Sequence, residues 1–159
     1  MDLTAAAHAL ESSALGAWVR GSPVAYPVAN LVHLLGLVLL IGGIGIVDLR
    51  LIGLGRRIPP MPLARFLTPL AIAGLMLLLA SGFLLFAADA GPLIRSAAFR
   101  WKMVLLALAL INAILFQLLW RRKVGGWSRG VPSPARAMAG LSLGLWLAIA
   151  TFGRLIAYN

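Results

Sequence analysis

Long apolar runs constrain the fold of this chain more than any other feature. The first run extends from Tyr26 to Gly53 and reads YPVANLVHLLGLVLLIGGIGIVDLRLIG. A helix of roughly 20 apolar residues spans the hydrocarbon core of a bilayer, which is about 30 Å thick. The composition agrees, because 62% of the 159 residues are hydrophobic and 11% are charged, whereas soluble domains are about 25% charged. We therefore expect an all-α integral membrane protein.

Four such runs follow one another, separated by segments rich in Gly, Pro and basic residues. We predict membrane spans at about 28–47, 67–88, 101–120 and 137–157. Prolines between the first two runs prevent a continuous helix there. Pro69 is expected in the first turn of the second span, where its missing N–H costs little. Residues 23–159 are thus predicted to form one four-helix transmembrane domain.

The N-terminal segment, residues 1–22, has a different character. Apolar residues recur at helical spacing between Leu3 and Arg20, but the stretch is too polar and too short to span a bilayer. We expect one amphipathic helix in the membrane interface, with Trp18 at headgroup depth. The segment has no early Lys or Arg and no cleavage site, so we do not expect a signal peptide.

The net charge of +10 comes from 14 Lys and Arg residues that lie mostly between the apolar runs. Nine of them are in the loops after the first and third spans, and five are elsewhere. Because basic residues accumulate on the cytoplasmic side, these two loops are predicted to be cytoplasmic and both termini periplasmic. The expected location is a bacterial inner membrane, and the expected contact of the basic residues is lipid rather than nucleic acid.

Motifs exclude several classes of function. The chain has no Cys, which excludes disulfides, Cys-ligated zinc and iron–sulfur clusters. It has no GxSxG, HExxH, P-loop or CxxC pattern, so the sequence favours a non-enzymatic protein. The predicted spans also lack the paired carboxylates of a proton-coupled transporter.

His33 is the ionisable residue that lies deepest in a predicted span, about two turns from its outer end. A neutral imidazole can bind a metal or a haem iron, and His8 is the second histidine that a bis-His haem would need. Met76, Met103 and Met138 are possible softer ligands, and Met103 is expected at the depth of His33. The alternative is that His33 is a hydrogen-bonded packing residue.

Other polar residues are expected at the same outer level, namely Glu11, Asn30, Asp89, Arg100, Lys102 and Arg154. Asp89 is predicted to pair with Lys102 or Arg154. With His33 these residues could hold a haem propionate, a copper ion or a quinone headgroup. The alternative is that the cations only extend to headgroup depth.

The remaining candidates are interpreted as structural. Asp48 and Arg50 are expected at the inner end of the first span, in contact with Arg121 or Gln117. Asn112 is a polar residue near the middle of the third span. Gly140, Gly144 and Ala148 stand four apart and form a small-residue face suited to close helix packing.

Three stretches resemble a known family: HLLGLVLLIGG, LARFLTPLAIAGLMLLLASGFLL and FRWKMVLLALALINAIL. They are similar to the membrane domain of CopD-type copper resistance proteins. A more specific similarity is to small uncharacterised bacterial four-helix proteins, in which an ESS…YP…H…DLRLIG pattern precedes LLFAADA…FRWK. The resemblance covers most of residues 11–157. It implies copper handling, and its patterned positions are Glu11, His33, Asp48, Arg50, Lys102 and Asn112.

Two functions are therefore expected. The first is a binding protein with haem or copper near His33 on the periplasmic side, for metal handling or electron transfer. The second is an accessory subunit of a larger membrane complex, or a homo-oligomer, that docks through the face of Gly140, Gly144 and Ala148. A quinone-linked enzyme is a third and weaker alternative.

Overall fold

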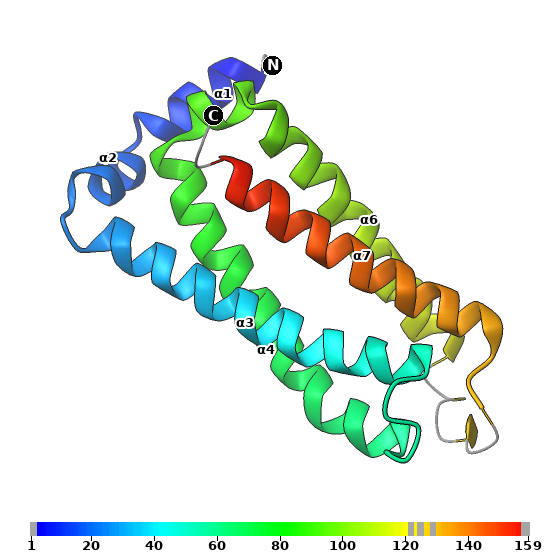
Figure 1. Ribbon diagram of the computed structural model, residues 1–159. Helices are drawn as coiled ribbons and strands as arrows, with labels where there is room; N and C mark the ends of the chain where they lie inside the picture. Colours follow the sequence, from blue (N-terminus) through cyan, green and yellow to red (C-terminus); the bar gives the residue numbers. More distant parts are fainter. Residues whose placement is uncertain (1–2, 121–122, 124–125, 128–129, 157–159) are drawn as a thin grey trace.

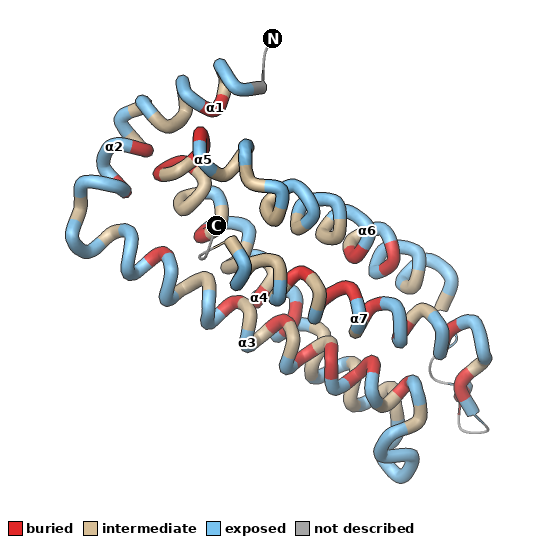
Figure 2. The backbone as a smooth tube through the Cα atoms, turned by 45° about the horizontal axis from the view of Figure 1, so that its top comes forward, coloured by how far each residue is buried: buried red, intermediate tan, exposed pale blue. Residues whose placement is uncertain are grey.

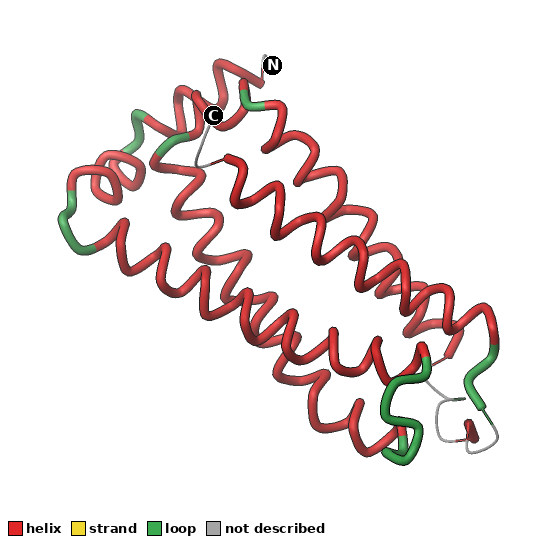
Figure 3. Tube along the Cα trace, in the orientation of Figure 1, coloured by secondary structure: helices red, strands yellow, loops and turns green. Residues whose placement is uncertain are grey.

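The computed structural model of the protein describes residues 3–120, 123, 126–127 and 130–156. It consists of seven α-helices joined by short connections, and the described residues contain no strand (Figures 1 and 3). The helices are α1 Leu3–Glu11, α2 Ala14–Gly21, α3 Ala25–Ile52, α4 Pro60–Ala88, α5 Ala90–Arg95, α6 Ala97–Trp120 and α7 Ser133–Leu155. The predicted all-α fold is confirmed.

Four of these helices are long and apolar enough to cross a membrane. They are α3, α4, α6 and α7, with 28, 29, 24 and 23 residues, which gives lengths of roughly 35 to 44 Å. Many of their large apolar side chains are exposed (Figure 2), and Leu118 on α6 is 76% exposed. Water does not tolerate so much exposed apolar surface, whereas lipid does. The chain is therefore a multi-pass membrane protein.

The long helices are arranged as two pairs. α3 crosses α4, α6 runs along α7, and α3 joins the pairs through its contact with α7 (Figure 1). We call the end that carries α1, α2 and α5 the capped end, and the end with the α3–α4 and α6–α7 connections the loop end. α4 and α6 form no extended contact with each other. The two pairs are thus open on the side of α4 and α6.

Glycines set the approach of α3 to α4. A Cβ atom added to Gly74 would stand 2.6 Å from the Leu40 backbone nitrogen and 2.7 Å from the Gly36 carbonyl oxygen. Gly43 also lies close to α4, because its added Cβ would stand 3.0 Å from the Ala71 Cβ. The backbones are therefore in direct contact, as small residues permit in membrane helices.

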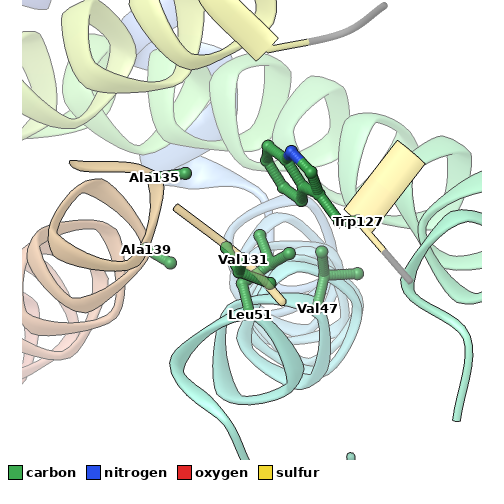
Figure 4. Close-up of a cluster of buried hydrophobic side chains, with 6 residues drawn as sticks. All are labelled: Val47, Leu51, Trp127, Val131, Ala135 and Ala139. Carbon is green, nitrogen blue, oxygen red and sulfur yellow. The ribbon is translucent and has the colours of Figure 1, made fainter. Parts of the chain in front are cut away.

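Two apolar clusters fill the interior. One lies midway along the long helices and contains Leu40, Ala71, Ala109, Leu145, Trp146 and Ile149. The other lies at the loop end, where Trp127 and Val131 of the α6–α7 connection pack on α3 and α7 (Figure 4). This second cluster contains Val47, Leu51, Trp127, Val131, Ala135 and Ala139.

The helices extend beyond the predicted spans in several places, and the local predictions for Pro69 and for the loop after the second span were wrong. α3 continues five residues beyond the predicted end at residue 47, so Asp48 and Arg50 are helical. α4 begins at Pro60, because proline is tolerated in a first turn, and Pro69 lies inside the helix. α5 occupies a stretch that was predicted as loop, and Ala157 at the predicted end of the fourth span lies outside the described residues.

The single N-terminal helix was also a wrong prediction. The segment forms two helices, because Ser12 and Ser13 bond to nearby backbone and interrupt it. The Ser13 hydroxyl donates to the Leu10 carbonyl oxygen over 2.6 Å and accepts from the Gly16 N–H, which caps α2. Both helices are too short to span, as expected, and they lie across the capped end (Figure 1).

Candidate functional site

A cavity of about 220 Å³ lies between all four long helices near the loop end. Each helix contributes at least one oxygen-bearing side chain to its lining. These side chains are Asp48 from α3, Thr68 from α4, Asn112 and Gln117 from α6, and Ser142 from α7. Arg65 of α4 also lines the cavity, and the remaining wall is mostly apolar.

Asp48 is the unusual residue of this cavity. Its place on the lining follows from helical spacing, since Ile44, Val47, Asp48 and Leu51 form one face of α3. The residue is only 4% exposed. The Ser142 hydroxyl is its side-chain hydrogen-bond donor, and the second carboxylate oxygen, Oδ2, has no hydrogen-bond partner. A buried polar atom without a partner costs about 1–3 kcal/mol.

No cation of the described chain balances Asp48. The ion pairs among the described residues are those of Glu11 with His8 and Arg20, at the opposite end of the molecule. Arg65 lines the same cavity, but it lies beyond the 4.0 Å of an ion pair with Asp48. A carboxylate in such an interior is expected to hold a proton or a bound cation, because an isolated charge there is costly.

Asn112 is fixed by a hydrogen bond to the neighbouring helix. It is 7% exposed, and its Nδ2 donates to the Met138 carbonyl oxygen over 3.1 Å. Because the amide nitrogen is committed to a carbonyl group, the amide oxygen Oδ1 remains as an acceptor. Asn112 therefore offers an oriented neutral oxygen to the cavity.

The cavity has its mouth between α4 and α6. Three of its lining residues are exposed, namely Arg65 on α4 and Ala113 and Gln117 on α6. These two helices form no extended contact. A ligand can therefore reach Asp48 from the side on which α4 and α6 are apart.

His33, the predicted cofactor ligand, lies on α3 nearer the capped end. Its Nδ1 is 3.0 Å from the Ser81 Oγ, and Ser81 donates its own hydrogen to the Leu77 carbonyl oxygen over 2.5 Å. Nδ1 must therefore be the donor, so in the neutral form of the ring Nε2 is the nitrogen without a proton. The ring lies against Gly82, whose added Cβ would stand 3.2 Å from Cε1.

The other predicted cofactor residues are only partly brought together. Lys102 is close enough to His33 to affect it electrostatically, and it lies beside Gly153 of α7. His8 instead lies beside Glu11 and Gly91. The remaining two, Met103 and Arg154, are exposed. No three His, Cys, Asp or Glu residues come together to hold a metal ion in the part of the chain that the structure describes.

Glu11 ties the capped end together. Its Oε2 accepts from the Gly91 N–H over 2.8 Å, and its Oε1 lies 3.4 Å from the Arg20 Nη1. Arg20 also donates to the Ala88 carbonyl oxygen over 2.6 Å. Asp89, predicted to pair with Lys102 or Arg154, has the Tyr26 hydroxyl as a side-chain partner. Glu11 therefore holds α1, α2 and the start of α5 together in this structure.

Arg50 holds the α3–α4 connection. Its Nε donates to the Ile58 carbonyl oxygen and its Nη2 to the Arg56 carbonyl oxygen over 3.1 Å. The predicted contact with Arg121 lies outside the described residues. On α7, Gly140 and Gly144 are exposed with no atom within 4 Å of an added Cβ, so their face packs on nothing within the described chain.

Comparison with protein-family models, with curated proteins and with solved structures gave no match. The class of protein that the fold defines is thus a four-span membrane protein with a buried acidic cavity. Thr68 and Ser142 were not predicted from the sequence as site residues, and Asp48 was predicted at the end of a span. The apolar residues that follow it, Leu49, Leu51 and Ile52, were the available indication that the helix continues.

Proposed function

We propose that this membrane protein binds a small cation at Asp48. The observation that supports this function is the Asp48 Oδ2 atom, which is buried without a partner against a cavity of about 220 Å³. Ionisable residues inside membrane proteins are costly and mark binding or transport sites by default. A cation in the cavity would supply the positive charge that the described residues do not supply.

A purely structural role explains Asp48 less well. A structural carboxylate is normally satisfied on both oxygens, as Glu11 is by the Gly91 N–H and Arg20. The chain has 14 Lys and Arg residues, yet none of the described ones forms an ion pair with Asp48. An isosteric apolar residue would avoid the cost of burying this group. The presence of an acid at position 48 therefore favours a bound ligand.

The proposed setting is a bacterial inner membrane with the loop end in the cytoplasm. The nine basic residues of the two loops support this orientation, and the resemblance to small bacterial membrane proteins supports the location. In this orientation the mouth of the cavity faces the cytoplasmic half of the bilayer. We infer that the cation exchanges with the cytoplasmic side.

A hydrophobic carbodiimide provides the test, because it reacts with protonated carboxyl groups inside membranes. The purified protein would be labelled in lipid nanodiscs, and modification of Asp48 would be followed by mass spectrometry. We expect labelling at Asp48 that at least one small inorganic or organic cation slows by tenfold or more. Glu11, whose two oxygens are already paired, is the control carboxyl group. An Asp48 labelling rate that is the same in every cation would refute the proposal.

Haem or copper at His33 stays a prediction. The supporting feature is the donation of the His33 Nδ1 to Ser81, which leaves Nε2 as the ligand atom of a neutral ring. The nearby ammonium group of Lys102 disfavours a cationic metal there. Absorption spectra and metal analysis of protein from its native membrane, compared with His33→Ala, provide the test. A Soret band or bound copper that disappears in the variant would support it, and a colourless, metal-free protein would contradict it.

The accessory-subunit function also stays a prediction. The exposed face at Gly140 and Gly144 supports it, because backbone is accessible there for close contact with another helix. Purification in mild detergent is the test. A partner membrane protein or a second copy should co-purify with the wild-type chain and be lost from Gly144→Leu. Purification of the wild type as a lone monomer would contradict this function.

A further inference from the structure

We propose that the ligand of Asp48 is a monovalent, largely dehydrated inorganic cation of the sodium type, and that it replaces a proton on the carboxyl group. This inference rests on the cation-binding function proposed above and names its ligand. Four oxygen atoms, one from each long helix, are assigned as ligands: Asp48 Oδ2, Thr68 Oγ1, Asn112 Oδ1 and Ser142 Oγ.

The charge of the cavity selects a monovalent ion. Among the described residues, Asp48 and Arg65 are the ionisable side chains of its lining; Arg65 is exposed, so Asp48 is the one buried charge. One carboxylate neutralises one positive charge, whereas a divalent ion would leave a net charge in a low-dielectric interior. Calcium and magnesium sites commonly use several carboxylates, and the described residues contain no such group.

The chemistry of the lining selects an inorganic ion. The polar atoms available are carboxylate, hydroxyl and amide oxygens, which are the ligands that hard cations prefer. Organic ammonium ions are instead typically recognised by several aromatic faces, and Phe116 is the one aromatic residue of this cavity. A water molecule needs about 10–15 Å³ of such a cavity. The volume of about 220 Å³ therefore leaves room for waters that complete the coordination shell.

The mouth of the cavity also favours monovalent over divalent cations. Arg65 is exposed where the cavity opens between α4 and α6. Its positive charge repels an entering divalent cation twice as strongly as a monovalent one at the same distance. The apolar walls, which include Ile44, Val47 and Leu51 of α3, then favour an ion that loses most of its water.

The exchange of a proton for Na⁺ on Asp48 conserves both charge and atoms. The empty site holds a protonated Asp48, and binding of Na⁺ gives the sodium carboxylate and releases one H⁺ toward the mouth. The helices that face α3 contribute no second carboxyl group that would compete for the proton. α6 and α7 present only neutral side chains to the cavity, and the ionisable residue that α4 presents is Arg65. Sodium affinity should therefore fall as the pH is lowered, because protons compete for the same oxygen.

Protection from the carbodiimide measures the selectivity. Labelling of Asp48 in nanodiscs would be recorded in NaCl, LiCl, KCl, MgCl₂, CaCl₂ and methylammonium chloride, with N-methyl-D-glucamine chloride keeping the ionic strength constant. We expect Na⁺ to protect at a concentration at least tenfold lower than Mg²⁺, Ca²⁺ or methylammonium. Adding NaCl to weakly buffered protein should release about one proton per site, and Asp48→Asn should release none.

Two threonines give a matched pair of variants. Thr68→Val removes the hydroxyl assigned to the site and keeps its shape, and it should raise the protecting Na⁺ concentration tenfold or more. Thr151→Val is the control, because Thr151 is exposed on α7 and bonds the Leu147 carbonyl oxygen of its own helix. Circular dichroism spectra that match that of the wild type would show that both variants are folded.

The outcomes separate the two proposals. Protection by Mg²⁺, Ca²⁺ or methylammonium at the same or a lower concentration than by Na⁺ would overturn the sodium-type ligand, while the cation-binding function would stand. Equal loss of protection in Thr68→Val and Thr151→Val would overturn the assigned coordination. Absence of protection by any of these cations would overturn both the ligand and the function.

Discussion

The contact between α3 and α4 makes Gly74→Ala a stringent test of the fold. A Cβ atom at this position would stand 2.6 Å from the Leu40 nitrogen, 2.7 Å from the Gly36 oxygen and 2.9 Å from the Leu39 Cβ. These distances are about 1 Å shorter than an ordinary contact of 3.5–4.0 Å. Two of the three atoms are backbone, so a change of rotamer cannot relieve the overlap and the two helices must move apart.

Two opposing contributions determine how much Gly74→Ala changes the free energy of unfolding. Overpacking of this kind costs about 1–3 kcal/mol, and the higher helix propensity of alanine returns about 1 kcal/mol in a helix interior. We expect Gly74→Ala to lower the free energy of unfolding by up to about 2 kcal/mol. Gly140→Ala is the matched control, because no atom lies within 4 Å of an added Cβ there. It should leave the protein unchanged or up to about 1 kcal/mol more stable.

Unfolding of both variants in mixed micelles, titrated with SDS and followed by circular dichroism, measures these differences. The two glycines lie on transmembrane helices and receive the same methyl group, so the comparison isolates the contact between α3 and α4. The packing described above would be refuted if Gly74→Ala were as stable as Gly140→Ala. It would also be refuted if Gly140→Ala were the more damaging of the two.

Three other substitutions test hydrogen bonds away from the cavity. Glu11→Ala leaves the Gly91 N–H without its acceptor and should destabilise the capped end by about 1–3 kcal/mol. Hydrogen exchange in residues 3–21 should be faster, and unchanged exchange would contradict the role of Glu11. Arg50→Ala frees two carbonyl groups of the α3–α4 connection and should speed protease cleavage between Gly53 and Pro59, while equal cleavage would argue against it. Ser81→Ala removes the acceptor of the His33 Nδ1 and should lower the free energy of unfolding by about 1 kcal/mol, with no change expected if the ring were held elsewhere.

Hydrophobicity was sufficient to predict the number, order and approximate position of the long helices. The unbroken apolar runs identify them, because few other structures satisfy the backbone in lipid. Their ends were less predictable, since proline is compatible with a first turn and the chain uses Pro60 and Pro62 in that way. The break at Ser12 and Ser13 depends on a choice between side-chain and helical hydrogen bonds, which spacing alone does not decide.

The candidate site was less predictable than the fold. The cofactor site was predicted at His33, near the capped end, because His33 is the ionisable residue deepest in a predicted span. Asp48 was predicted to lie at the end of that span. Four helices must be packed before Thr68 and Ser142 are known to line the same cavity as Asp48. Apolar spans also have little amphipathic pattern, so periodicity does not show which face of α6 carries Asn112 inward. Long-range packing, rather than local sequence, brings these residues together.

The bonds that secure the capped end have a consequence for biosynthesis. Glu11 is 80 residues before its partner Gly91, and Arg20 is 68 residues before Ala88. Ribosomes add roughly 5–20 residues per second, so α1 and α2 wait about 4–16 s for the segment that will hold them. During that interval α3 is the one long helix already synthesised that α2 contacts in the final fold. The second span must therefore be inserted before the first twenty residues of the protein can take their final place.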